Sequence, residues 1–439
     1  MKIKAFIFFI CLAHYPYQGS AQSVGMENDP YPLFFLQKNL TQLLINDNIS
    51  PPVASRNYVY PHIAAYCILA MSEKGIPITN AIEHFPSITW DVPGNNYSPS
   101  FAASVAFYQV AAAMIYTQQP FTDSFSVLLN WYKARGMDSV TFRVSSKIGN
   151  QVAKTISEWM NKDRFNETRN MSKYILLKEP GKWQLTSPSY LPAVEPYWGK
   201  LRPLLCNGLK EIDQLKPIAF DSLERSDFYQ EALNIYNIKR GLTEEQKEIA
   251  SFWDCNPFAI KPIGHINLIE KKISPGGHWM NITGIACKNT KSDILETSKA
   301  FTLCAISLFD AFIITWDKKY LYNYLRPETF IEQMGIDNNW QPFIQSPPFP
   351  EFPSGHAVVS NSAATVLTLL FGNNFSYVDN SETEFGLKER KFNSFYEAAE
   401  EATISRVYGG IHFLFSCELG KKMGRIIGTQ IGLKIKTNK

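Results

Sequence analysis

Apolar residues recur three or four positions apart along most of this chain, the spacing that places them on one face of an α-helix. No stretch of useful length alternates apolar and polar residues as a half-buried strand does. The periodicity predicts helices over residues 33–44, 58–71, 101–116, 123–133, 145–160, 221–235, 243–252, 293–316, 356–370, 384–405 and 418–434. We therefore expect an all-α fold, built as a helical bundle.

A proline-rich stretch between residues 179 and 217 interrupts the helical pattern. Because prolines remove backbone donors and end helices, this stretch marks either a domain boundary or a long loop around the bundle. We place a boundary at its start. This gives an N-terminal helical region over 22–180 and a second helical domain over 181–439.

Two apolar features resemble membrane segments, but their polar residues favour a buried position in a bundle. Residues 300–316 are apolar yet contain Asp310 and are short for a membrane span, so we expect a core helix in which Asp310 satisfies a buried partner. The last predicted helix has a glycine at every fourth position from Gly420 to Gly432, interrupted by lysines and an arginine. We expect this stripe to pack closely on another helix, and we expect no membrane span.

The first 21 residues, MKIKAFIFFICLAHYPYQGSA, combine two early lysines, an apolar core and a small-residue ending. This is the composition of a secretory signal peptide cleaved after Ala21, and it predicts a secreted or periplasmic protein. Cleavage removes Lys2 and Lys4 and no acidic residue, so the formal net charge falls from +3 to +1. This balance gives no reason to expect nucleic acid or an anionic membrane as a partner.

The cysteines after this segment are scattered singly, without a CxxC pair. This argues against a metal knuckle and favours buried apolar thiols. There are six of them: Cys67, Cys206, Cys255, Cys287, Cys304 and Cys417.

The first of three clusters with candidate chemistry is KYLYNYLRP, which contains Lys319 and Arg326. Arg326 lies seven positions after Lys319, which is two helical turns, so we expect both cations on one helix face. Pro327 is expected to end that helix and to leave Arg326 near its terminus.

The second cluster is PSGH, in which Ser354 is a typical N-cap and Gly355 permits close approach of the backbone to a bound atom. His356 follows in the first turn of the predicted helix, where free amides and the helix dipole favour an anion. In the third cluster, SRVYGGIHF, Arg406 can donate two hydrogen bonds to an oxyanion, and the two glycines permit a turn that brings His412 towards the same place.

Each cluster alone is compatible with a structural role: a solvated basic face, a capped turn, or an arginine and a histidine around a turn. Together they supply what a tetrahedral oxyanion requires. Three cations neutralise its charge, hydroxyl and amide donors hold its oxygens, and two imidazoles offer a covalent partner and an acid–base group. The combination predicts an oxyanion pocket in the C-terminal bundle.

The motifs Lys-x6-Arg-Pro, Pro-Ser-Gly-His and Ser-Arg-x5-His make the chain resemble the superfamily of type 2 phosphatidic acid phosphatases and vanadium-dependent haloperoxidases. FWDCNP (252–257), PGGHWMNI (275–282) and FPEFPSGH (349–356) resemble its soluble bacterial haloperoxidase-like branch. The resemblance implies a pocket for vanadate or phosphate in which His412 is the covalent partner, as vanadium ligand or nucleophile, and His356 the acid–base group. It assigns the oxygens to Lys319, Arg326, Ser354, Gly355 and Arg406.

One position departs from the superfamily pattern, in which an aspartate four residues after the covalent histidine orients its ring. Ser416 stands there, and Glu418 is close enough in sequence to substitute for it. A serine does not stabilise an imidazolium as a carboxylate does. The departure therefore favours a neutral, metal-ligating His412 over a nucleophilic one, or a weakened enzyme.

The resemblance thus implies a vanadium-dependent haloperoxidase, with vanadate as cofactor and with peroxide and halide as small-molecule substrates. Two alternatives stay open: a secreted acid phosphatase that forms a phosphohistidine at His412, and a degenerate protein that binds phosphate without turnover. Outside the motifs, His278 is a candidate for the pocket mouth, and Asp254 and Asn256 are candidates for bracing an arginine.

Overall fold

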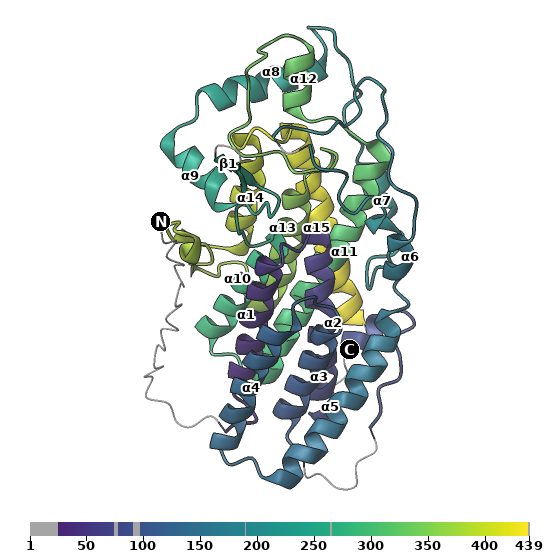
Figure 1. Ribbon diagram of the computed structural model, residues 1–439, viewed down its shortest axis with the longest axis vertical. Helices are drawn as coiled ribbons and strands as arrows, with labels where there is room; N and C mark the ends of the chain where they lie inside the picture. Colours follow the sequence, from purple (N-terminus) through teal and green to yellow (C-terminus); the bar gives the residue numbers. More distant parts are fainter. Residues whose placement is uncertain (1–24, 74–77, 91–96, 189, 264–265, 438–439) are drawn as a thin grey trace, which may run out of the picture.

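The computed structural model describes residues 25–73, 78–90, 97–188, 190–263 and 266–437, and the predicted signal peptide lies outside them. A first group of long helices occupies the lower half of Figure 1: α1 (Tyr31–Asn46), α2 (Pro51–Ser72), α3 (Pro99–Ala112), α4 (Gln118–Ala134) and α5 (Ser139–Met160). Within it α2 and α5 pack against α3, and α1 packs against α4.

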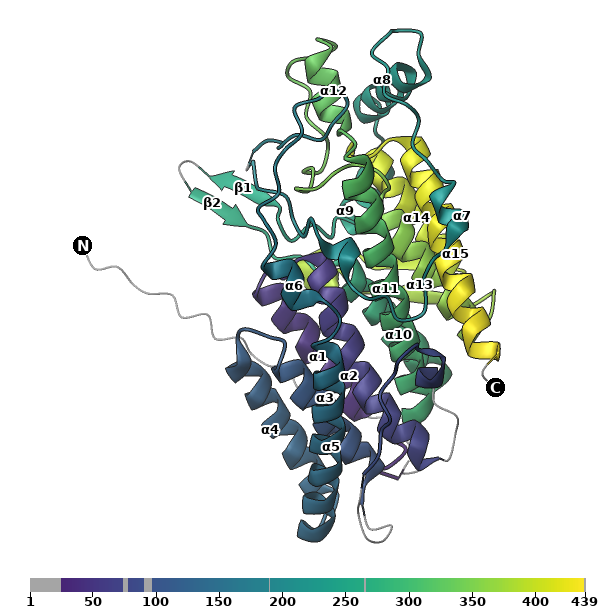
Figure 2. The same cartoon turned by 90° about the vertical axis from the view of Figure 1, so that its right-hand side faces the viewer.

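A second group of helices forms the C-terminal bundle, drawn in green and yellow in Figures 1 and 2: α10 (Pro275–Thr290), α11 (Ile294–Tyr322), α13 (Gly355–Phe371), α14 (Phe395–Tyr408) and α15 (Leu414–Thr437). α11 joins the two groups, because it packs on α2 from the first and on α13 from the second. The buried apolar side chains of both groups consequently form one continuous hydrophobic core.

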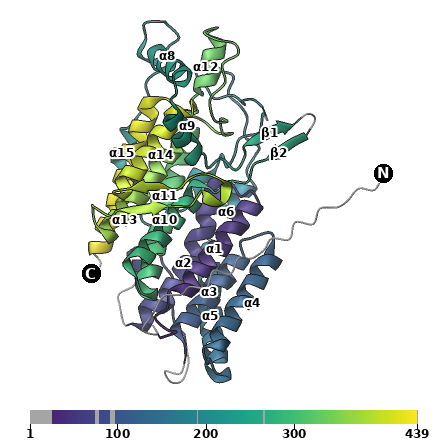
Figure 3. The ribbon, with the colours of Figure 1, turned by 90° about the vertical axis from the view of Figure 1, so that its left-hand side faces the viewer.

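Several of the short elements lie at the upper end of the C-terminal bundle. Figure 2 shows α8 and α12 at the top and the β1–β2 hairpin projecting from one side, and Figure 3 shows the same features from the opposite direction. The β1–β2 and β3–β4 pairs are both antiparallel, with Ile260 opposite Ile269 in the first and Tyr377 opposite Phe392 in the second. The short elements are α6 (Phe165–Arg169), α7 (Lys210–Asp213), α8 (Asp227–Arg240), α9 (Glu244–Phe252), α12 (Pro327–Gln333), β1 (Ile260–Ile263), β2 (Ile266–Ile269), β3 (Tyr377–Asp379), β4 (Arg390–Phe392) and the 3₁₀ turns η1 (Ile78–Ala81), η2 (Trp198–Lys200) and η3 (Thr383–Phe385).

The all-α prediction is confirmed, with corrections in the second half of the chain. The helix predicted over 384–405 is wrong in its first part, because η3, Gly386 at φ 84° and strand β4 precede the Ser394 cap of α14. α10 was not predicted because it opens with Pro-Gly-Gly, although Ser274 caps it by accepting from the Gly277 amide. The short hairpins gave no alternating pattern long enough to predict them.

The glycine stripe of α15 packs against α13, as predicted. A Cβ on Gly424 would lie 2.3 Å from the Val358 carbonyl oxygen, and a Cβ on Gly428 would lie 2.5 Å from Cβ of Thr365. The two helices therefore approach to backbone contact only because these positions are glycine. This contact positions α13, whose first turn carries the second sequence cluster.

α11 is long and apolar enough to cross a membrane by length and composition, but 89% of its most apolar window is buried in the protein. Asp310 in its middle accepts hydrogen bonds from the backbone N–H groups of Leu204, Leu205 and Cys206 at 2.7, 2.7 and 2.9 Å. The expected buried partner of Asp310 is thus a loop of the proline-rich stretch. The same stretch contacts the C-terminal bundle where Trp183 N–H donates to the Asn323 carbonyl, and the boundary at residue 181 stays a prediction.

Candidate functional site

The three sequence clusters meet at a small cavity of about 30 Å³ in the C-terminal bundle. Four of the predicted residues line it directly: Gly355, His356, Arg406 and His412. The other three lie immediately behind its wall, because Ser354 precedes Gly355, Lys319 Cε is 3.8 Å from where a Gly355 Cβ would lie, and Arg326 contacts His412. All seven predicted site residues therefore belong to one site.

The start of α13 forms one wall of the cavity. Ser354 is its N-cap (φ −62°, ψ 113°), and its Oγ accepts from the Ala357 amide at 3.5 Å. The first amides of a helix have no partner within the helix, and the positive end of its dipole lies there. Since Gly355 lines the cavity without a side chain, these amides are accessible to an anion.

His412 also lines the cavity, after the turn made by Gly409 and Gly410, the latter at φ 75°. Its Nδ1 is 2.7 Å from Oε1 of Glu351, and its Nε2 is 3.1 Å from Nη1 of Arg326. Burial and the positive charge of Arg326 hold the pKa of His412 well below its usual value, so the ring is neutral. A neutral ring that donates Nδ1–H to a carboxylate carries its lone pair on Nε2, the form in which histidine binds a metal.

The carboxylate that orients His412 is Glu351, which the sequence analysis missed. The expected substitute, Glu418, instead pairs with Lys421 at 2.8 Å and is half-exposed. Ser416 is buried beside Glu351 and makes no hydrogen bond to the ring among the described contacts. The proposed loss of the carboxylate partner is therefore wrong: Glu351, the acid within FPEFPSGH, supplies it from 61 residues upstream.

Glu351 is held in place by the chain that follows His412. Its Oε1 also accepts from the Phe413 amide at 3.1 Å, and the side chain is fully buried. Burial raises its pKa to about 7, against the lowering effect of Arg326 and Lys319. A Glu between two prolines gave no sequence signal for this role, because the contact depends on how two distant loops meet.

Lys319 and Arg326 do not share a helix face, contrary to the sequence prediction. α11 ends at Tyr322, Asn323 turns the chain at φ 51°, and Arg326 caps the start of α12. Arg326 donates to the carbonyl oxygens of Phe349 and Ile411 at 2.9 and 2.8 Å, in addition to its contact with His412. The two cations therefore come together through the packing of two separate helices, and not through their spacing along one helix.

Lys319 Nζ donates to three carbonyl oxygens of the 350–353 segment at 2.8, 2.9 and 2.6 Å. It thus fixes the loop that leads into α13. Burial and the neighbouring Arg326 hold its pKa well below the usual value, and burial lowers the pKa of Arg326 to about 10. A cluster of buried cations with depressed pKa values favours binding of an anion.

Arg406 reaches the cavity from α14 and is held by the FWDCNP segment. Its Nη2 donates to the Trp253 carbonyl at 2.6 Å and its Nε to Ser405 Oγ at 2.9 Å. The neighbouring Asp254 pairs with Lys272 at 2.5 Å, and Asn256 bonds the Gln345 carbonyl. Neither Asp254 nor Asn256 therefore hydrogen-bonds an arginine among the described contacts. Asp254, which lines the same cavity, supports Arg406 by its charge, which raises the pKa of the guanidinium against the lowering effect of burial.

His356 is the second imidazole of the cavity, and its Nε2 is buried without a hydrogen-bond partner among the described residues. Burial, followed by the positive charge of Arg406, holds its pKa well below the usual value. Buried polar atoms are normally satisfied, so an unpartnered nitrogen in a cavity indicates a ligand position. Together with the three cations and the Nε2 lone pair of His412, this donor set fits a tetrahedral oxyanion such as vanadate.

The prediction that His278 lines the pocket mouth is wrong. It is fully buried behind the FWDCNP segment, with Nε2 2.7 Å from Asp379 and its ring stacked on Trp253 at 4.6 Å.

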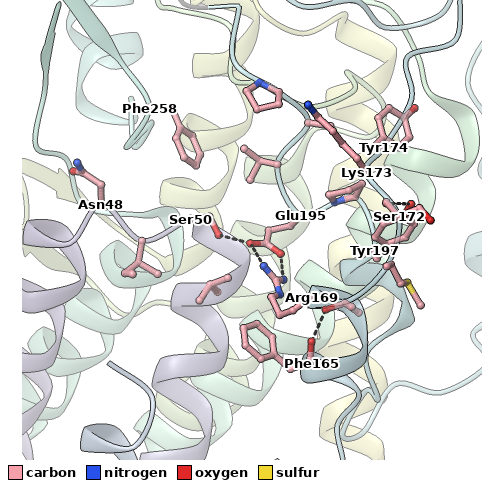
Figure 4. A pocket seen from close by; sticks show the side chains of 18 of the residues that line it. Asn48, Ser50, Phe165, Arg169, Ser172, Lys173, Tyr174, Glu195, Tyr197 and Phe258 are labelled. Carbon is pink, nitrogen blue, oxygen red and sulfur yellow. Dashed lines mark hydrogen bonds and ion pairs between the residues drawn. The ribbon is translucent and has the colours of Figure 1, made fainter. Parts of the chain in front are cut away.

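A larger groove of about 560 Å³ lies beside the cavity. Figure 4 shows Phe258 and the ion pair of Arg169 with Glu195 among the side chains that line it. Phe258 lines both spaces. The Val194 carbonyl, on the groove wall, accepts from the indole of Trp316, which lines the cavity, at 3.1 Å. The groove and the cavity thus share a wall.

The fold and site define a helical-bundle protein with an oxyanion pocket, and comparisons with known proteins agree. A crystal structure of a bacterial vanadium-dependent iodoperoxidase is 39% identical with a TM-score of 0.85, and the match covers 93% of this chain and 96% of that one. The chain therefore belongs to the vanadium-dependent haloperoxidases, and it is an enzyme of that oxidoreductase type.

More distant comparisons support the same fold. A holo-type bacterial vanadium-dependent chloroperoxidase is 12% identical with a TM-score of 0.64, covering 89% of this chain and 93% of that one. Residues 299–437 match the family model described as the second helical-bundle domain of VCPO. A search among curated proteins found no match.

Proposed function

We propose that this enzyme uses hydrogen peroxide to oxidise iodide, with vanadate held at His412. The choice of iodide rests on the relative that is 39% identical over most of both chains, an iodoperoxidase. The observation that carries the proposal is the state of His412: neutral, with Nδ1 2.7 Å from Glu351 and a lone pair at Nε2 beside the cavity. That state suits a metal ligand.

The remaining residues hold the oxyanion. Arg326 and Arg406 supply charge, while the amides at the start of α13 and Ser354 Oγ supply neutral donors. Lys319 contributes its charge from behind Gly355 and keeps the 350–353 loop in place. When bound, vanadate supplies the Lewis acidity that activates peroxide for two-electron transfer from a halide.

His356 handles the proton. Its neutral ring has a free Nε2 in the cavity, which accepts a proton from incoming hydrogen peroxide and returns it when the peroxide O–O bond breaks. Oxidation of iodide by peroxide then balances as H₂O₂ + I⁻ + H⁺ giving HOI and H₂O. The groove of Figure 4 is the side from which these small molecules approach, since Phe258 lines both the groove and the cavity.

The N-terminal segment supports export, so we place this activity in the periplasm or outside the cell. Peroxide and halide are then drawn from the medium rather than from the reducing cytoplasm.

The test uses the mature protein with and without orthovanadate. We expect vanadate-dependent oxidation of iodide by peroxide, lost in His412→Ala and retained in His84→Ala, an exposed histidine far from the motifs in sequence. Bromide serves as the second halide. Hydrolysis of an aryl phosphate that vanadate inhibits, without any halide oxidation, overturns the proposal in favour of an acid phosphatase. Binding of vanadate without either activity favours the degenerate binding protein.

A further inference from the structure

A cluster of buried reactive side chains lies directly behind one wall of the cavity, and the proposed mechanism does not use it. It consists of Cys255, His278, Asp379 and Glu382, which come from the segment after α9, from α10, from β3 and from the turn before η3. Cys255 is the only one of the four that lines the cavity, next to His356 and Arg406. All four side chains are buried.

The geometry is that of a thiol, an imidazole and a carboxylate in a row. Cys255 Sγ lies 3.8 Å from Nδ1 of His278, and Nε2 of the same ring lies 2.7 Å from Oδ2 of Asp379. Glu382 Oε1 is 3.1 Å from the same Nδ1 that faces the thiol. The ring stacks on Trp253, which fixes its plane. In this orientation Nδ1 faces both the thiol and Glu382.

The charges around the ring favour the imidazolium. Burial lowers the pKa of His278, but Asp379, Cys255 and Glu382 together outweigh this effect, so that the pKa is well above its usual value. Burial raises the pKa of Cys255, which keeps the resting side chain a neutral thiol. The thiol therefore sits between the reaction cavity and a fixed positive N–H donor.

We propose that Cys255 is a modification site, oxidised to sulfenic acid by the hypohalous acid that the enzyme itself makes. This rests on the proposed function, because hypohalous acid is its product. The thiol sulfur attacks the halogen of HOX, a sulfur–halogen bond forms, the halogen–oxygen bond breaks and water leaves with the thiol proton. Water then displaces halide from sulfur, giving Cys–SOH, X⁻ and a proton that Glu382 accepts. Sulfur loses two electrons and the halogen gains two.

The charged His278 ring stabilises the oxidised form of Cys255. His278 Nδ1 lies 3.8 Å from Sγ behind the cavity wall, and the positive charge of the ring offsets the negative charge of a sulfenate. On the cavity side, an added oxygen occupies part of a space of only about 30 Å³ and offers Arg406 a competing acceptor. Oxidation of Cys255 therefore lowers turnover, and reduction of the sulfenic acid by a thiol restores it.

The other buried cysteines provide the internal comparison. Cys417 lies close enough to Ser354 to hydrogen-bond it but does not line the cavity, and Cys287 lies near Thr297, in the α10–α11 region. Both are as buried as Cys255. A selective effect at Cys255 consequently reports its exposure to the cavity and its His278 partner, rather than general sensitivity of thiols to oxidant.

The experiment is peptide mass spectrometry of the vanadate-loaded enzyme after turnover with peroxide and iodide, quenched with a carbon nucleophile selective for sulfenic acids. We expect labelling of Cys255 several-fold above that of Cys417 and Cys287, and only background labelling when iodide is omitted. Equal labelling of the three cysteines, or labelling by peroxide alone, overturns the proposal.

Activity provides the second readout. Each enzyme is compared with its own initial rate, after the same number of turnovers. The unmodified chain is expected to lose several-fold more of its rate than Cys255→Ser, and dithiothreitol followed by desalting restores it; Cys287→Ser is the matched control and behaves like the unmodified chain. Should Cys255→Ser fail to fold, the labelling result decides alone. Halide oxidation with Cys255 unlabelled overturns this inference only, whereas absence of halide oxidation overturns the proposed function and this inference with it.

Discussion

At the scale of single residues, the site depends on which carboxylate holds His412. Glu351 binds both the ring Nδ1 and the amide of the next residue, so it fixes the tautomer and the orientation of the imidazole together. Partners of this kind raise the basicity of a ligating histidine. In the sequence, Ser416 stands where the motif has the carboxylate that orients the histidine. In the structure, Glu351 from a distant loop supplies that carboxylate.

Glu351→Gln is expected to weaken vanadate binding by about 10–100-fold, the usual effect of removing the partner of a metal-bound histidine. The amide retains the volume and one acceptor but not the charge. Ultrafiltration with vanadium analysis measures the affinity directly, without relying on turnover. Ser416→Ala, the matched control, should leave the affinity nearly unchanged. A larger loss in Ser416→Ala than in Glu351→Gln would show that the serine orients the ring.

Gly355→Ala tests whether the glycine serves the cavity rather than the fold. An added Cβ meets its nearest neighbours, Lys319 Cε and Trp316 Cζ3, at 3.8 Å, which is ordinary contact, so we expect the thermal unfolding midpoint to stay close to that of the parent. The methyl nevertheless projects beside a cavity of about 30 Å³ and should lower vanadate affinity. Unchanged affinity with lowered stability would contradict this assignment.

At the scale of elements, the approach of α15 to α13 determines where the first turn of α13 lies. The sequence showed the stripe of four glycines and the need for a close partner, but not that the partner is the helix bearing Ser354 and His356. Local pattern identifies what an element requires, and tertiary packing decides what satisfies it.

Gly424→Ala should destabilise the protein by about 1–3 kcal/mol, the range for overpacking a tight interior, because its Cβ would meet the Val358 carbonyl oxygen at 2.3 Å. Gly432→Ala is the control, since its Cβ meets chiefly the Cδ1 end of Leu369, a half-exposed and flexible side chain. Urea unfolding of both variants measures the difference. Helix propensity alone favours alanine over glycine at both positions, so equal destabilisation by the two alanines would mean that the contact of Gly424 with the Val358 carbonyl does not set the effect.

At the scale of the whole molecule, the sequence predicted the all-α class, most of the long helices and the seven candidate residues that the structure brings together at one cavity. It could do so because helical periodicity and local motifs are written in neighbouring residues. It missed Glu351, the separation of Lys319 and Arg326 into different elements, and the buried place of His278. Each of these depends on contacts between segments far apart in the chain, which no local pattern records.

The two helix groups are joined by a buried histidine that makes stability depend on pH. His62 of α2 contacts Gln37 of α1 through Nε2 at 2.7 Å, and its ring stacks on Phe301 of α11 at 4.9 Å. Burial lowers its pKa to about 3, so the folded state requires the neutral ring. Because the folded pKa lies below the unfolded value of 6.5, the contribution is present above pH 6.5 and is lost as pH falls from 6.5 towards 3.

We therefore expect His62→Gln to be less stable than the parent at pH 7.5, through lost packing on Phe301, and the gap to narrow steadily as pH falls to 4.5. The parent loses stability over this range because unfolding allows its imidazole to bind a proton, whereas the glutamine variant has no such term. Urea midpoints of the vanadate-free proteins at several pH values measure the gap, with the exposed His84→Gln as control. A gap that is constant from pH 7.5 to 4.5 would mean that His62 already carries its proton in the folded core. In that case the Gln37 side chain would accept a hydrogen bond from a charged imidazolium in the folded protein, and not from a neutral ring.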